Sequence, residues 1–140
     1  MALKDEAWRH DPARYPFRVA LPVRYGDLDT NCHLNNVAIA RLFEETRLRF
    51  HAVLRARGAA VDPGGVLLAH VAIDYVAEGS YPQDVEATAA VLAVGRRSWR
   101  LGLGLFQAGR LLAVADCVMV SRAADVGPAL RPALEAHAPL

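Results

Sequence analysis

One change of hydrophobic period restricts the fold of this chain more than any other feature. From residue 36 to about residue 57, apolar side chains recur every three or four positions, whereas from residue 66 to residue 120 they recur at every second position. The first period predicts a long amphipathic helix, and the second predicts β-strands. One helix followed by strands joined through short turns indicates an α+β fold, with the helix on one face of an antiparallel sheet.

The predicted helix has recognisable ends. Asn35 or Asn36 can cap its first turn, and Gly58 is typical of a helix C-terminus. About 22 residues at 1.5 Å each span about 33 Å, which is enough to cross a small domain. The expected apolar face consists of Ile39, Leu42, Phe43, Thr46, Phe50, Val53 and Leu54. On the solvated face, we expect ion pairs between Glu44 or Glu45 and Arg41, Arg47 or Arg49.

Five strands are predicted, at residues 17–25, 66–77, 83–94, 98–106 and 111–120. Turns are expected at residues 62–65 and 107–110, and a short helix between Pro128 and about residue 137. Pro22 lacks an amide donor, so the first strand should lie at an edge or carry a bulge.

The last strand is apolar on both faces apart from Asp116, so both faces should be covered. The helix covers one face, and another subunit is the simplest cover for the other.

Composition limits the class of protein. A chain of 140 residues suits one domain, which we expect at residues 17–140 after an N-terminal extension at residues 1–16. The net charge of +1 gives no reason to expect binding to nucleic acid or an anionic membrane. Because the sequence has no signal-peptide pattern, no membrane-length apolar segment and no C-x-x-C pair, we expect a cytoplasmic protein in which Cys32 and Cys117 are free thiols.

The chemically reactive residues gather in the loop before the predicted helix. Residues 24–36 read RYGDLDTNCHLNN, and they bring carboxylates, an imidazole and carboxamides between two apolar segments. A loop of this composition is either a turn or a site. Free N–H groups at a helix N-terminus can stabilise a developing negative charge, which favours a site. Taken alone, Asp29 is more simply a residue that caps a turn.

No cofactor is expected. His33 with Asp27 and Asp29 is a weak metal-ligand set, because all three side chains come from one short loop.

The loop, followed by residues 43–47 (FEETR), resembles the hotdog-fold acyl-CoA thioesterases of the 4-hydroxybenzoyl-CoA thioesterase-like family. Residues 81–85 (YPQDV) and 95–99 (GRRSW) are similar to later segments of that family, so the resemblance covers roughly residues 17–120. It implies a hotdog fold, in which a five-stranded antiparallel sheet wraps around one long helix. It also implies a dimer or tetramer with the acyl pocket between subunits, and hydrolysis of an acyl-CoA or acyl-carrier-protein thioester.

The resemblance assigns roles within the loop. Asp29 matches the family's catalytic carboxylate, and the backbone N–H near Asn36 matches its oxyanion donor. An ionised Asp29 can attack the thioester carbonyl or deprotonate a water. His33 either orients the loop or contacts the substrate, Asn35 either caps the helix or binds substrate, and Asp27 is expected to be structural.

Further substrate contacts are expected from Arg96, Arg97 and Ser98. The basic side chains of Arg96, Arg97 and Arg100 could hold the phosphates of coenzyme A. A solvated strand end is the plainer interpretation of these arginines. The chain departs from the family pattern at Cys32, where glycine is usual before the histidine, and at Ile39, where an aromatic residue is common. Two other functions remain open: a hotdog hydratase or dehydratase using His33 with Asp29, and a non-catalytic acyl-thioester-binding protein.

Overall fold

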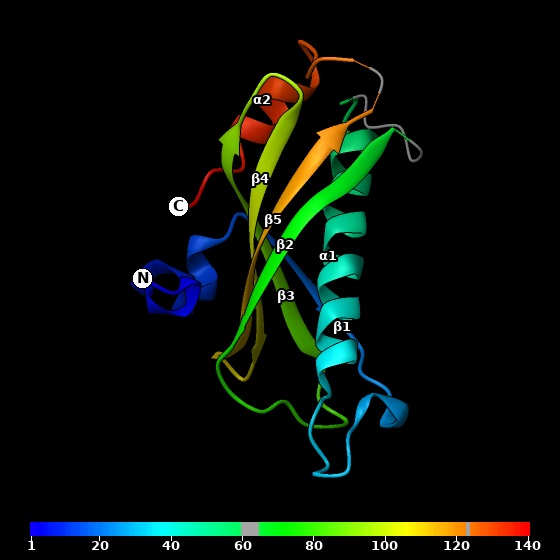
Figure 1. Ribbon diagram of the computed structural model, residues 1–140, viewed down its shortest axis with the longest axis vertical. Coiled ribbons are helices and arrows are strands. Elements are labelled where there is room, and N and C mark those ends of the chain that lie inside the picture. Colours follow the sequence, from blue (N-terminus) through cyan, green and yellow to red (C-terminus); the bar gives the residue numbers. More distant parts are fainter. Residues whose placement is uncertain (60–64, 123) are drawn as a thin grey trace.

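The computed structural model describes residues 1–59, 65–122 and 124–140. Its described part contains a five-stranded antiparallel sheet with the order β1-β3-β4-β5-β2. The strands are β1 (Phe17–Leu21), β2 (Val66–Tyr75), β3 (Val85–Val94), β4 (Ser98–Gln107) and β5 (Arg110–Ser121). The long helix α1 (Asn36–Ala56) lies along one face of the sheet, and the short helix α2 (Leu130–Glu135) lies near one end of it (Figure 1). This arrangement confirms the predicted hotdog fold.

Both predicted ends of α1 are confirmed. The Asn35 side chain accepts a hydrogen bond from the Ala38 amide at 2.7 Å. At the other end Gly58 has a φ of 89°, and the Ala59 amide donates to the Leu54 carbonyl at 3.0 Å. A positive φ at this position is readily adopted by glycine and closes the last turn.

The buried face of α1 is wider than the sequence predicts. Ile39, Phe43 and Phe50 are buried against the sheet as expected, but Arg47 and His51 are also buried, with exposures of 8% and 6%. The prediction that Arg47 lies on the solvated face is therefore wrong. A curled sheet contacts the helix over more of its circumference than a flat one, so residues beside the apolar stripe are covered too.

The surface ion pairs of α1 follow the prediction in part. Glu45 pairs with Arg49 at 3.1 Å, whereas Arg41 pairs with Asp27 in the preceding loop.

The strands differ from the prediction mainly at their ends. β1 occupies an edge of the sheet as expected, but it ends at Leu21, immediately before Pro22. A two-residue turn joins β4 to β5, with Ala108 and Gly109 at φ values of 50° and 75°, which is typical of a type I′ hairpin. The turn expected at residues 62–65 lies largely outside the described residues.

The outer face of the sheet is covered by the chain's own N-terminal segment (residues 1–16). This segment forms the 3₁₀ turns η1 (Leu3–Asp5), η2 (Ala7–His10) and η3 (Pro12–Arg14). Tyr15 joins Phe106 and Val114 in a second buried cluster, and Trp8 packs against it. The expectation that another subunit covers this face of β5 is therefore wrong for the part that the segment occupies.

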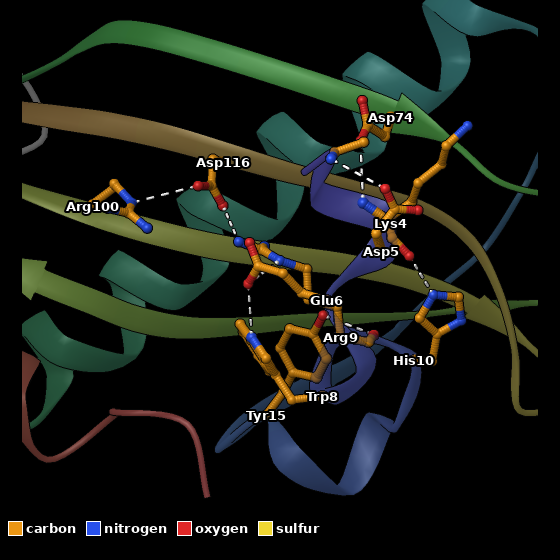
Figure 2. A network of polar contacts seen from close by, with 11 residues as sticks. Lys4, Asp5, Glu6, Trp8, Arg9, His10, Tyr15, Asp74, Arg100 and Asp116 are labelled. Carbon is orange, nitrogen blue, oxygen red and sulfur yellow. Dashed lines mark hydrogen bonds and ion pairs between the residues drawn. The ribbon is translucent and has the colours of Figure 1, made fainter.

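A buried ionic network fastens the N-terminal segment to the sheet (Figure 2). Arg9 is fully buried, and its guanidinium lies 2.7 Å from Asp116 of β5 and 3.2 Å from Glu6. Arg100 of β4 lies 3.4 Å from the second carboxylate oxygen of Asp116. Gly102 makes room for Arg9, because a Cβ atom there would lie 3.1 Å from its Nη1. The polar residue that interrupts β5 is thus the anchor of this segment.

The edge strand β2 remains open. Leu67, Leu68, Val71 and Tyr75 are each at least 41% exposed. An exposed apolar edge strand presents unpaired backbone groups to any strand that can pair with it. None of the described helices is long and apolar enough to cross a membrane.

Candidate active site

Asp27 holds the entrance to α1. Its carboxylate accepts hydrogen bonds from the Arg24 amide at 2.9 Å, the Arg24 guanidinium at 3.0 Å and the Arg41 guanidinium at 3.1 Å. The Asn35 amide donates to the Asp27 carbonyl at 2.8 Å. With 4% exposure, Asp27 is a buried, doubly paired carboxylate. These contacts fit the structural role expected from the sequence.

Asp29 closes a tight turn within the same loop. Its Oδ1 accepts hydrogen bonds from the Asn31 amide at 2.8 Å and the His33 amide at 3.3 Å. Its own amide donates to the His33 carbonyl at 2.9 Å, and its carbonyl accepts from the Cys32 amide at 3.0 Å. The residue is exposed, and its Oδ2 makes no hydrogen bond to any residue that the structure describes. One carboxylate oxygen therefore orders the loop, while the other is available to a ligand.

Cys32 has a φ of 60°, in the left-handed region that favours glycine. Cysteine adopts this conformation at a cost of about 1 kcal/mol, whereas glycine, the residue usual at this place in the family pattern, would adopt it more readily.

The first turn of α1 lies directly after this loop. Because helix N-termini lack intrahelical acceptors, the Asn36 and Val37 amides have no partner in the helix. No other described residue accepts from them, since the Asn35 side chain takes the Ala38 amide. Asn35 is thus a capping residue in this structure. The imidazole of His33 makes no hydrogen bond to a described residue, and only its backbone holds the loop.

Residues that the sequence did not single out support the loop from behind. The Leu34 amide donates to the Gly79 carbonyl at 3.0 Å, and a Cβ atom on Gly79 would lie 2.6 Å from Leu34 Cδ1. Gln107 is 4% exposed and binds the Ser80 backbone at 2.9 and 2.8 Å and the Gln83 carbonyl at 3.0 Å. In the sequence, the local feature that indicates these supporting contacts is Gly79-Ser80, a pair typical of turns.

A groove of about 420 Å³ runs between α1 and β2. It is lined by Val37, Ala40, Arg41, Glu44, Arg47, Leu68, Val71 and Ile73. A second groove, of about 360 Å³, lies on the other side of α1 and includes Pro22, Arg24, Asp27 and Leu48. Asp29 lines neither of them. Within a single chain, the available oxygen of Asp29 therefore lies on a surface that no described groove encloses.

The other predicted substrate contacts lie at the far end of the molecule (Figure 1). Arg96 and Arg97 form the β3–β4 turn, and Ser98 begins β4. The Arg97 guanidinium donates to the Arg122 carbonyl at 3.1 Å. The 21 residues of α1 separate this end from Asp29 by about 30 Å. One chain does not bring the two predicted parts of the site together.

In the part of the chain that the structure describes, no group of three histidine, cysteine, aspartate or glutamate side chains is placed to hold a metal ion.

The long helix, the curled antiparallel sheet and the acidic loop at the helix N-terminus together define a hotdog-fold enzyme of the thioesterase class. The sequence matches the Thioesterase-like superfamily over residues 23–134, and the chain belongs to that superfamily. No curated protein gives a match to the chain.

Solved structures from several bacteria are similar over nearly their whole length. The PA5185 protein of Pseudomonas aeruginosa is 27% identical with a TM-score of 0.76, covering 92% of this chain and 96% of that one. A Thermus thermophilus thioesterase, solved with coenzyme A and Zn, is 25% identical with a TM-score of 0.76, covering 88% and 95%. A putative acyl-CoA thioesterase from Xanthomonas campestris is 26% identical with a TM-score of 0.67, covering 81% and 98%.

Proposed function

We propose that this thioesterase hydrolyses acyl-CoA thioesters to coenzyme A and a carboxylic acid. The observation that carries the proposal is an exposed aspartate, Asp29, on the loop that leads directly into α1. Among the described residues, one oxygen of Asp29 and the amides of Asn36 and Val37 have no hydrogen-bond partner. The likeness to a thioesterase that binds coenzyme A supports the choice of substrate.

The chemistry needs one nucleophile and one donor. In the nucleophilic route, the Asp29 carboxylate bonds to the carbonyl carbon, the carbon–sulfur bond breaks and coenzyme A leaves as a thiolate. Water then hydrolyses the mixed anhydride and restores the carboxylate. In the general-base route, Asp29 takes a proton from the attacking water instead. The Asn36 amide stabilises the oxyanion in both routes, and a donor of this kind contributes about 3 kcal/mol in the transition state.

A second copy of the chain is part of the proposal. Pairing of two β2 edges about a two-fold axis would cover the exposed Val71 and Tyr75. Such antiparallel pairing reverses the ends of the two copies. The first turn of α1 in one copy then faces the same end as the β3–β4 turn of the other, whose Arg96 and Arg97 would hold the coenzyme A phosphates beside Ser98.

The assembly has its own test. Val71→Asp puts a charge in the middle of the β2 edge and should give a monomer in sedimentation equilibrium with greatly reduced turnover. The control is Arg18→Asp on β1, the opposite edge strand, which should leave assembly and turnover unchanged. A Val71→Asp variant that is monomeric and fully active would exclude the shared site.

A panel of aliphatic and aromatic acyl-CoAs, followed with a thiol reagent, tests the function itself. We expect thiol release from at least one member, and no loss of the crotonyl-CoA double bond in the ultraviolet. Hydration of crotonyl-CoA without thiol release would favour the hydratase instead. Ligand-induced stabilisation without either activity would favour a binding protein.

A further inference from the structure

Two arginines of the described chain, Arg9 and Arg47, are nine-tenths or more buried, and they differ in whether a carboxylate pairs with them. Arg9 lies against two carboxylates, those of Asp116 and Glu6. Arg47 is 8% exposed, and no described carboxylate forms an ion pair with it. Glu44, one turn earlier on α1, is exposed and makes no ion pair with Arg47. Buried arginines are normally paired, because an uncompensated charge in a protein interior is costly.

The groups packed around Arg47 do not neutralise it. Burial raises the pKa of the Cys117 thiol to about 11, although the nearby Arg47 guanidinium acts to lower it, so the thiol stays uncharged. Burial lowers the pKa of neighbouring His51 to about 4, so the imidazole is also uncharged near neutral pH. The Trp99 indole donates to His51 Nε2 at 3.1 Å, which requires an unprotonated nitrogen. Among the described residues, the Arg47 guanidinium therefore has no carboxylate partner.

Arg47 lines the groove between α1 and β2, and the same groove is lined by Val37 from the first turn of α1. Its α1 side is a single stripe at helical spacing, which starts at Val37 in the first turn and reaches Arg47. The β2 side is apolar, formed by Leu68, Val71 and Ile73. The groove volume of about 420 Å³ is within the range of small-molecule sites.

The length of the groove suits a medium-length acyl chain. Arg47 follows Asn36 by about three helical turns, or roughly 16 Å along the axis, and helical side chains lean back toward the N-terminus. A thioester carbonyl at the Asn36 amide would direct an extended chain along the apolar β2 wall. The far end of that chain would then reach the guanidinium of Arg47.

We propose that Arg47 binds an anionic group at the far end of the acyl chain, so that the preferred substrates are ω-carboxyacyl thioesters. This inference rests on the proposed function. A planar guanidinium matches a carboxylate in two parallel hydrogen bonds, and a site built for such a pair discriminates against an uncharged methyl end.

The test compares two substrates that differ only at the far end, octanedioyl-CoA and octanoyl-CoA. Wild type should have a kcat/KM at least about 10-fold higher for octanedioyl-CoA. Arg47→Met keeps the apolar stem and should lower kcat/KM for octanedioyl-CoA far more than for octanoyl-CoA, which abolishes that preference. The matched control, Arg49→Met, removes an exposed cation from the same helix and should keep the preference.

Two outcomes would overturn the inference: no preference in wild type, or a preference that survives Arg47→Met because kcat/KM falls equally for both substrates. Equal losses together with dissociation in sedimentation would mean that Arg47 pairs with a carboxylate of a second copy. If Arg47→Met does not fold, Arg47→Gln replaces it in the same comparison.

Direct binding separates this inference from the proposed function. If no acyl-CoA is hydrolysed, the proposed function fails, and calorimetric titration with octanedioate and octanoate decides the role of Arg47. Saturable binding of octanedioate by wild type, lost in the Arg47 variant and absent for octanoate, would support the inference. Absence of binding, or equal binding of both acids, would overturn it.

Discussion

Asp27 and Asp29 are separated by one residue, yet their surroundings differ completely. Asp27 is buried and compensates the charges of Arg24 and Arg41. Asp29 is exposed, and the described partners of its carboxylate are two amides of its own loop. The oxygens of a carboxylate already engaged by two guanidiniums are less available to a substrate than an oxygen without a partner. For this reason we propose Asp29 as the catalytic carboxylate and a structural role for Asp27.

The close approach of Gly79 to Leu34 predicts that a side chain at residue 79 would disturb the loop. Gly79→Ala would place its Cβ 2.6 Å from Leu34 Cδ1 and 3.0 Å from Leu112 Cδ1. Relief of this overlap requires movement of the loop, and we expect a loss of about 1–3 kcal/mol in unfolding free energy, with reduced turnover. Urea denaturation measures the first effect. Gly26→Ala is the control, since nothing lies within 4 Å of its Cβ, and a comparable loss in that variant would contradict the explanation.

Local and distant contacts differ in how well the sequence predicts them. Asp29, Asn35 and Asn36 lie within eight residues of one another, so their spacing alone brings them to one loop and helix end. Gln107 reaches Ser80 across a separation of 27 residues, and no local pattern predicts that contact. Contacts between residues far apart in the sequence, such as those that support this loop, can be identified only from the folded structure.

The element that organises the molecule is α1, and its burial explains why one sequence prediction failed. Helical periodicity predicts a single apolar stripe, which suits a helix lying on a flat surface. Here the curled sheet also buries Arg47 and His51 beside that stripe. The type and ends of the helix were predictable, because capping and periodicity are local. The extent of its buried face was not, because it depends on the curvature of the sheet.

His51 of α1 accepts a hydrogen bond from Trp99 of β4, and its burial should make the stability of the protein depend on pH. Burial lowers its pKa from 6.5 to about 4 in the folded protein, so between these values the unfolded chain binds more protons. The free energy of unfolding should therefore fall as the pH drops from 7 to 4, by up to about 3 kcal/mol from this residue. Denaturant titrations of wild type and His51→Gln at each pH measure the difference. A variant that loses as much stability as wild type over that range would rule out His51 as the cause.

In the whole molecule, the N-terminal segment covers the face of the sheet that the sequence predicted another subunit to cover. Apolar outward-facing positions of β5 correctly indicated a covered face, but patterning cannot tell which part of an assembly covers it. Tyr15 packs edge-on against Phe106 with ring centroids 6.0 Å apart and donates to the Arg9 carbonyl at 3.0 Å. Because the segment occupies this face, β2 and α1 remain as the open apolar surfaces of the described chain.

Tyr15→Ala tests this arrangement. The variant should lose about 3–5 kcal/mol in unfolding free energy and expose the outer face to an apolar fluorescent dye. Tyr25→Ala is the control, since Tyr25 is 74% exposed and its removal should change stability little. If Tyr15→Ala were as stable as wild type and bound no dye, the N-terminal segment would not be an integral cover.

The rate of thiol release by Asp29→Asn, compared with wild type on the best acyl-CoA of the panel, tests the central claim most directly. Asparagine keeps an acceptor oxygen for the Asn31 and His33 amides but has no charge, so the loop should survive while turnover falls at least about 100-fold. Asp84→Asn, at an exposed residue before β3, should retain the wild-type rate. A folded Asp29→Asn protein with a near-normal rate would contradict the account.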